Sequence, residues 1–556
     1  MLCSKKVVGH RRSRLKAEGL RLKGKNIIAG KVGPVFLLLC FSIVFTTGCR
    51  FSKEIKDPES IRIGALADAR MLLPLFASDS ASSEISGLIF NGLTKYDKNI
   101  NITGDLAEKW EIKNNGREII FYLRKGVLWH DGVEFTSRDV LFTYKAVTDP
   151  RNPTPYSGIY GPVEKVEALD RYTVRVLYKE PFAPALESWG MGIMPAHLLE
   201  GKDLAKSEFN RRPVGTGPYK LAKWITGQRI ELERFDNYFE GTPGIKKYIS
   251  RIIPDLSTMF LELKFGGIDY MGLTPSQYKL KADTEFFKKR FQKFRYPAFG
   301  YTYLGFNLLD ERFRDRRVRQ AIAYAIDKEK IIKGVLLGFG RPCTGPFPPD
   351  SWAYNKNVKG YPYDPEKALN LLREAGWVLD NGILKKEGKP FRFTILVNQG
   401  NNQRLMAAQI IKEDLKKIGI EVDIRVIEWQ TLLHQFIDKK RFEAVIMGWA
   451  LSRDPDIYDI WHSSKTKEGE FNFISYSNPD VDKLLLKGRT TLDKEKRKRI
   501  YHRIHEILHE DQPTVFLYVP DALPILHRRF KGIEPSPLGI WHNFVHWYVP
   551  LNRMEW

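Results

Sequence analysis

The sequence contains little cysteine. It has four cysteines in 556 residues, and three of them, Cys3, Cys40 and Cys49, lie near the N-terminus. Cys343 is the one cysteine after residue 49, in the part of the chain that is expected to fold. A single thiol cannot close an internal disulfide or supply the several thiolates of a cysteine-bound metal site. The sequence therefore predicts a fold that depends on its packed core, without disulfides or cysteine-bound metal.

The strongly basic N-terminus is not followed by an apolar run long enough to span a membrane. Residues 1–31 carry ten Lys and Arg against one acid, Glu18, and the apolar run at 35–45 comes next. As a helix this run would extend about 16 Å, roughly half of a ~30 Å hydrocarbon core. This pattern is typical of a secretion signal. The run ends in Thr46-Thr47-Gly48-Cys49, which resembles a bacterial lipoprotein box, although that motif usually has leucine in place of Thr46. We therefore predict a signal peptide at 1–48 and lipidation of Cys49.

Basic tracts of the kind that bind nucleic acid are absent beyond the leader. The formal net charge is +23, and a large part of the excess lies in residues 1–31. Elsewhere Lys and Arg are scattered among Asp and Glu, without aromatic-interleaved basic patches. We expect no nucleic-acid partner. A basic exported protein held at an anionic membrane surface is the simpler interpretation.

Catalytic motifs are nearly absent. The chain has no G-x-S-x-G, no P-loop and no cysteine for a Cys–His pair. His505-Glu506-Ile-Leu-His509 matches the H-E-x-x-H pattern of zinc peptidases. On a helix, however, His505 and His509 lie opposite the apolar side, which predicts a solvated basic face. Val515 stands where the longer form of the motif has its third histidine. We predict no enzymatic activity and no cofactor, and keep a zinc peptidase using His505, Glu506 and His509 as the alternative of another class.

The rest of the chain mixes strand and helix patterns. Apolar residues alternate over 391–397 and 420–426, and they recur at helical spacing over 407–418 between them. This order predicts a β-α-β unit with parallel strands, and hence an α/β lobe. Similar patterns predict strands at 61–64, 118–123, 172–178, 219–224, 230–235 and 299–308, and helices at 257–264, 318–326 and 364–376.

One stretch, 444–459, carries the features of a binding site. Residues 444–447 predict a buried strand that runs into a polar loop opening on Gly448 and Trp449. Glycine lets a ligand's backbone approach closely, and tryptophan offers a flat apolar wall with one N–H donor. Three acids follow, at 454, 456 and 459. A strand that ends this way is suited to face a cleft, and an ordinary turn is the alternative.

Four segments carry a resemblance to a known family. They are Gly104-Asp-Leu-Ala-Glu-Lys-Trp with the run 121–140, Pro213-Val-Gly-Thr-Gly-Pro-Tyr, Asp315-Arg-Arg-Val-Arg-Gln-Ala-Ile-Ala-Tyr-Ala-Ile-Asp, and Met447-Gly-Trp with Asp454-Pro-Asp. In this order they resemble the extracellular solute-binding proteins of peptide ABC transporters, the dipeptide and oligopeptide binding family. The match spans nearly the whole chain after the leader.

The resemblance implies an α/β fold of two hinged lobes, the periplasmic-binding-protein fold, with an extra third lobe found in large peptide binders. The lobes are discontinuous in sequence. The implied boundaries are 1–48 signal peptide, 49–60 linker, 61–95 lobe I, 96–210 extra lobe, 211–300 lobe I, 301–520 lobe II and 521–556 lobe I.

The same resemblance implies the function. The protein would be exported to the periplasm or the outer face of the cell membrane and lipid-anchored at Cys49. It would act as a monomer, capturing short peptides between its lobes and delivering them to the permease subunits of an ABC importer. Relatives of this fold also take sugars, nickel complexes, haem and opines, which remain alternative solutes. The expected ligand-binding residues are Gly448, Trp449, Ala450, Ser452, Asp454, Tyr303, Asn307 and Asn398.

Two positions depart from the family's pattern. Ser452 stands three residues after the tryptophan, where dipeptide and oligopeptide members have an aspartate for the ligand's α-amino group. Asp454 is the candidate to supply that charge. Asn398 stands where dipeptide members have an arginine for the ligand carboxylate. Since closure would bury both charged ends of a peptide, each charge needs another partner in this chain.

Overall fold

The computed structural model describes residues 57–550. The predicted signal peptide and Cys49 lie outside this range. Within it, no helix combines the length and apolar character that crossing a membrane requires.

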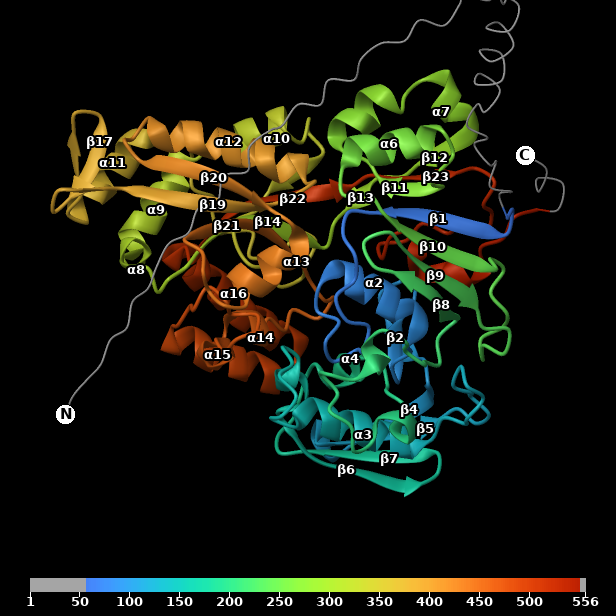
Figure 1. The fold of residues 1–556 in the computed structure, drawn as a ribbon. Coiled ribbons are helices and arrows are strands. Elements are labelled where there is room, and N and C mark those ends of the chain that lie inside the picture. The colour runs from blue at the N-terminus through green and yellow to red at the C-terminus, as the bar shows by residue number, and fades with distance from the viewer. Residues whose placement is uncertain (1–56, 551–556) are drawn as a thin grey trace, which may run out of the picture. The chain divides into compact units, whose positions relative to one another are not determined.

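A seven-stranded mixed sheet is assembled from three separate segments of the chain (Figure 1). Its strands, in spatial order, are β12 (Phe291–Lys293), β23 (Pro524–His527), β11 (Tyr270–Gly272), β1 (Ser60–Ala65), β10 (Lys247–Ile252), β9 (Arg229–Arg234) and β8 (Tyr219–Ile225). The β1 strand runs parallel to β10 and β11, and the other neighbours are antiparallel. This sheet joins strands from both ends of the described chain.

Helices α6 (Leu256–Lys264) and α7 (Glu285–Arg290) lie over one face of this sheet (Figure 1). The rings of Phe260 and Phe287 stack with centroids 5.1 Å apart. Both belong to a buried cluster that also contains Ile525 of β23. These contacts bury the apolar side of each short helix, which has too few turns to be stable alone.

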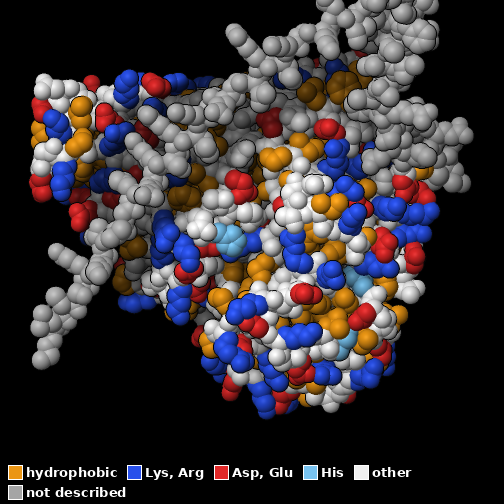
Figure 2. All heavy atoms as spheres, viewed as in Figure 1, with side chains coloured by type: hydrophobic (Ala, Val, Ile, Leu, Met, Phe, Trp, Pro, Cys, Tyr) orange, Lys and Arg blue, Asp and Glu red, His pale blue; other side chains and the backbone are white. Residues whose placement is uncertain are grey.

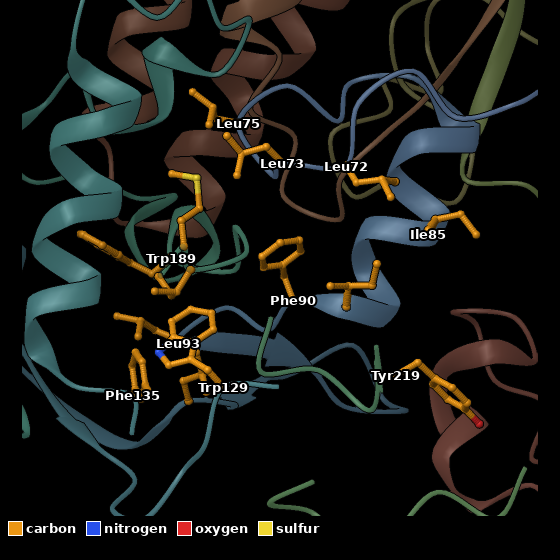
Figure 3. Close-up of a cluster of buried hydrophobic side chains, with 14 of the residues drawn as sticks. Leu72, Leu73, Leu75, Ile85, Phe90, Leu93, Trp129, Phe135, Trp189 and Tyr219 are labelled. Atoms are coloured by element: carbon orange, nitrogen blue, oxygen red, sulfur yellow. The ribbon is translucent and has the colours of Figure 1, made fainter. Parts of the chain in front are cut away.

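A four-stranded antiparallel sheet forms a second body. Its order is β4 (Ala107–Lys113), β5 (Glu118–Leu123), β7 (Thr173–Tyr178) and β6 (Val163–Asp170). Helix α3 (Ser137–Thr148) packs against it and begins with a capping box between Thr136 and Asp139. Figure 3 shows how Trp129 and Trp189 from this body meet Phe90, which follows helix α2 (Ser80–Ile89), in one continuous core.

The second large sheet contains the predicted β-α-β unit. In spatial order it has β13 (Tyr296–Pro297), β22 (Thr514–Ala522), β14 (Gly300–Phe306), β21 (Ala444–Ala450), β19 (Arg392–Asn398) and β20 (Glu421–Ile427), with β15 (Gly340–Pro342) also paired to β22. Helix α12 (Asn402–Lys416) connects the parallel strands β19 and β20. The predicted unit is therefore confirmed.

The remaining elements surround these three sheets. The helices are α4 (Ala185–Ser188), α5 (Ala196–Leu199), α8 (Glu311–Arg314), α9 (Arg316–Ala325), α10 (Lys328–Gly334), α11 (Pro365–Glu374), α13 (Trp429–Thr431), α14 (Tyr458–Trp461), α15 (Pro479–Thr490) and α16 (Lys494–Asp511). The small sheets are β2 (Thr94–Tyr96) with β3 (Ile102–Gly104), and β16 (Val378–Asp380) with β17 (Ile383–Lys386) and β18 (Lys389–Pro390). Helix α11, within the predicted 364–376, is capped by Asp364 and carries Pro365 in its first turn.

Charges of both signs are interspersed on the face that Figure 2 shows. Lys and Arg side chains alternate there with Asp and Glu, and the described residues of this face form no continuous basic band. Many surface charges of the described residues are in exposed pairs, such as Lys333 with Glu329. Such pairs contribute little to stability, and their main effect is on solubility.

Candidate functional site

The C-terminal half of β21 has one free edge. The strand pairs with β14 along its whole length, from Ala444 to Ala450. On its other side it pairs with β19 only at Ala444 and Val445. Beyond Val445, no residue of β21 is paired in register with a strand on this second side within residues 57–550. The polar loop thus begins after Ala450, later than predicted, because Gly448 and Trp449 still belong to the paired strand.

Aromatic side chains form a wall beside this edge. The ring of Trp449 is stacked on that of Tyr303, with centroids 6.5 Å apart and planes within 11°. Phe471 and Phe473 also contact Trp449, at 5.3 and 6.0 Å between centroids. Tyr303 is buried and Trp449 is half-buried, so Trp449 presents part of its surface outward. Two of the predicted site residues are therefore adjacent.

Asn398 and Arg404 bring a positive charge to the same edge. Asn398 ends β19, and its Oδ1 accepts a hydrogen bond of 2.9 Å from Nη1 of Arg404, in the first turn of α12. Nη2 of Arg404 lies 3.1 Å from where a Cβ on Gly448 would stand. Burial lowers the pKa of this guanidinium. Within residues 57–550, no carboxylate forms an ion pair with it.

The three acids of the loop after β21 are all paired with basic side chains. Asp454 makes a two-point ion pair with Arg497, at 2.5 and 2.7 Å. Asp456 pairs with Arg489 at 2.8 Å, and Asp459 pairs with Lys465 at 3.3 Å. A ligand that used Asp454 would have to compete with Arg497, because Arg497 already donates hydrogen bonds to both carboxylate oxygens of Asp454.

Glu187 of α4 supplies a different carboxylate to this loop. It accepts hydrogen bonds from the Ser452 hydroxyl and, at 3.0 Å, from the backbone N–H of Asp454. No Lys or Arg among the described residues forms an ion pair with it. Burial and the negative charge of Asp454 raise the pKa of Glu187 to about 7. An acid thus faces Ser452 from another part of the chain.

Asn307 does not belong to this group. It follows β14 at the end where Phe306 pairs with Ala444, whereas Gly300, at the other end, pairs with Ala450. Its side-chain amide donates to the carbonyls of Lys440 and Phe442, at 3.0 and 2.9 Å. The prediction that Asn307 contacts ligand is therefore corrected: its amide is committed to holding the turn before β21.

The predicted solvated histidine face of α16 is also wrong. His505 is 0% exposed, and both ring nitrogens are engaged, with the backbone N–H of Asn355 at 3.1 Å and the hydroxyl of Thr344 at 3.0 Å. Burial, then the nearby His509, lowers its pKa to about 3. The described residues contain no cluster of His, Cys, Asp and Glu that could hold a metal ion. The loop that covers this face comes from residues 343–361, which a helical wheel does not include.

One hollow of the described surface lies away from the loop after β21. A space of about 690 Å³ is lined by residues of α6 and α7, including Phe260, Leu261 and Phe286. Beside the loop after β21, by contrast, a gap of only about 10 Å³ remains next to Ser452 and Asp454.

Sequence reasoning missed Arg404 and Glu187. Arg404 follows Asn398 by six residues, so its distance from the end of β19 could have suggested it. Glu187 is 265 residues from Ser452, and no local pattern connects the two positions. Gly448, Trp449, Tyr303 and Asn398 are brought together around the free edge, with Ala450 at its exposed end.

Comparison with protein families and known structures identifies relatives of this chain. The family model of bacterial extracellular solute-binding proteins, family 5 (middle part), matches residues 101–471. The oligopeptide-binding protein AppA of Bacillus subtilis is 35% identical over 500 residues, which cover 88% of this chain and 91% of AppA.

Solved structures have the same fold. AppA of Bacillus subtilis in complex with a nonapeptide superposes with a TM-score of 0.84 at 34% identity, covering 88% of this chain and 99% of AppA. NikZ of Campylobacter jejuni in complex with Ni(L-His) gives 0.82 at 30% identity, covering 88% and 99%. DppA of Helicobacter pylori in complex with the peptide STSA gives 0.80 at 29% identity, covering 88% and 98%.

Proposed function

Because the chain belongs to the bacterial extracellular solute-binding proteins of family 5, we propose that it captures short peptides and delivers them to the permease subunits of an ABC importer. The observation that carries the peptide assignment is the free edge of β21. An extended peptide can add to such an edge through main-chain hydrogen bonds. This mode of binding is independent of side-chain sequence, as uptake of mixed peptides requires.

The residues around the edge fit this mode. Gly448 has no side chain to hold a peptide backbone away, and Trp449 with Tyr303 provides an apolar surface for a peptide side chain. Ala450 and Ser452 continue the edge outward. Glu187, which faces Ser452 and has no basic partner among the described residues, is the acid we assign to the peptide's amino group in place of Asp454.

The cellular setting is part of the proposal. Relatives are extracellular solute-binding proteins, which supports a site of action outside the cytoplasm. We propose that the chain is exported by residues 1–48, anchored through a lipid on Cys49 and active as a monomer. The lobe boundaries given above, including a first lobe assembled from 61–95, 211–300 and 521–556, are proposed on the same basis. We assign the protein no enzymatic activity and no cofactor.

Peptide-induced stabilisation tests the proposal. The protein, purified from cells that express the full chain, is heated alone and with mixtures of peptides of two to nine residues. A ligand present at about 100 times its Kd adds roughly 2.7 kcal/mol to the unfolding free energy, so the Tm rises by several degrees. Peptide mixtures should produce this rise, whereas nickel–histidine, haem and sugars should not.

A pair of tryptophan variants locates the effect. Trp449→Ala should reduce the peptide-induced rise in Tm, because it removes the aromatic ring beside the β21 edge. Trp110→Ala, at a half-buried tryptophan on β4, is the matched control and should leave the rise intact. A rise with a non-peptide solute, and none with peptides, would reject the peptide assignment while retaining the fold.

A further inference from the structure

We infer that Arg404 is the binding point for a carboxylate group of the captured solute, an inference that rests on the proposed function. The guanidinium carries a full positive charge, since arginine stays protonated in proteins. Among residues 57–550, its one side-chain hydrogen-bond partner is the neutral amide oxygen of Asn398, at 2.9 Å. A half-buried charge with no counter-charge is costly, and an anion that arrives with the solute would supply one.

Three other arginines of this lobe are held by carboxylate or carbonyl oxygens of the protein. Arg497 and Arg489 are paired with Asp454 and Asp456. Arg319 donates to four backbone carbonyl oxygens, including those of Asp511 and Gln512. Arg404 differs from them, because its Nε and Nη2 have no hydrogen-bond partner within residues 57–550. Two N–H directions therefore stay available for an oxygen ligand.

The position of Arg404 joins this charge to the proposed peptide site. Nη2 lies 3.1 Å from the place that a Cβ on Gly448 would occupy, so the guanidinium stands against the sheet face at Gly448, in the part of β21 that lacks a second partner strand. The missing side chain at Gly448 is what leaves room there. A peptide paired with this edge would carry a carboxylate into hydrogen-bonding range of Nη2.

The surroundings favour an anion. Arg404 is in the first turn of α12, where the helix dipole also attracts negative charge. The phenols of Tyr303 and Tyr518 lie close enough for the positive charge of Arg404 to lower their pKa values, against the larger raising effect of burial. Asn398 fixes one arm of the guanidinium, which pre-orients the fork for two-point binding of a carboxylate.

Peptides that differ only in their carboxylates test this inference. The probes are mixed-sequence peptides of two to nine residues without Asp or Glu, prepared as free acids and as C-terminal amides, together with amides that contain one Glu. Affinity is measured by titration calorimetry. The wild-type protein should bind free acids about ten- to a hundredfold more tightly than plain amides, as expected for one charge-assisted contact. If Glu-containing amides match the free acids, Arg404 accepts a carboxylate from the terminus or from a side chain; if only the free acids bind tightly, it takes the terminal carboxylate.

Variants identify the residue responsible. Arg404→Met should abolish the preference for carboxylates, and Arg404→Lys should retain part of it, because it keeps the charge without the fork. Arg392→Met is the matched control: Arg392 begins β19, at the opposite end from Asn398, and its pair with Asp423 is exposed. That variant should keep the full preference. Tm values without ligand establish that each variant is folded.

Three results separate failure of the inference from failure of the proposed function. Equal affinity of the wild-type protein for acids and both kinds of amide would overturn the role of Arg404 and leave peptide capture standing. A preference that survives Arg404→Met would do the same. Absence of binding to any peptide, free acid or amide, would overturn both.

Discussion

Replacing Asp454 by asparagine separates a structural role from a ligand-binding role for this residue. Asparagine keeps the shape of the side chain and removes its charge. In the wild-type protein both carboxylate oxygens accept hydrogen bonds from Arg497, at 2.5 and 2.7 Å, and the two side chains are 15% and 6% exposed. The substitution therefore leaves a buried guanidinium without its counter-charge.

The expected cost follows from this burial. Removing one member of a buried ion pair typically costs about 3–5 kcal/mol. Arg497 keeps its bonds to the Gly488 carbonyl, at 2.9 Å, and to the Tyr501 hydroxyl, at 3.2 Å. These remaining partners satisfy part of the guanidinium, so we expect a loss of about 3 kcal/mol, at the low end of that range.

Urea denaturation without added peptide measures this loss as a fall in the midpoint at unchanged slope. Glu329→Gln is the control, since Glu329 and Lys333 form a pair whose side chains are 75% and 76% exposed. That variant should show no measurable change in midpoint. The reasoning is refuted if Asp454→Asn unfolds at the wild-type midpoint and loses peptide affinity tenfold or more, because Asp454 would then serve the ligand.

Three further predictions concern the same site and the histidine helix. The pKa of Glu187 is raised to about 7, so the folded protein favours the protonated side chain. The protonated side chain contributes its full stability below the ordinary pKa of 4.5. This contribution is lost as the pH rises to about 7. Glu187→Gln should therefore match the wild-type urea midpoint at pH 4.5 and exceed it at pH 8 without ligand, and equal midpoints at both values would contradict this. Gly448→Val should reduce peptide affinity in calorimetry and also lower the Tm, because its Cβ would lie 3.1 Å from both Nη2 of Arg404 and the backbone carbonyl oxygen of Tyr301; unchanged affinity would argue against a ligand at this position. His505→Ala should lower the unfolding free energy by about 2 kcal/mol through loss of its hydrogen bonds to Thr344 and Asn355, with no change in bound zinc by elemental analysis, whereas loss of bound zinc would favour the peptidase alternative.

Local sequence patterns predicted individual helices and strands more completely than the way the strands pair into sheets. Alternating apolar residues located β19 and β20, and helical spacing located α12, because each pattern reflects burial of one face of one element. The pairing of β1 with β10 connects positions about 190 residues apart, which no local pattern encodes. The discontinuous first lobe was proposed from family resemblance alone.

In the candidate site too, local patterns identified some residues, and long-range contacts that no local pattern encodes determined the others. Gly448 and Trp449 could be selected because a buried strand led directly to them. The error at His505 arose because a helical wheel shows which residues share a side and cannot show that the 343–361 loop covers that side. Arg404 and Glu187 are candidates because neither forms an ion pair among the described residues. Only the three-dimensional structure shows this.

Native mass spectrometry of the protein purified from cells that express the full chain tests the central claim most directly. Ligand that co-purifies is detected as added mass on the intact protein, then released by denaturation and identified by fragmentation. Peptide capture through the β21 edge predicts a ladder of added masses that resolves into short peptides of many sequences. A single non-peptide mass, such as a nickel complex or a haem, would contradict it.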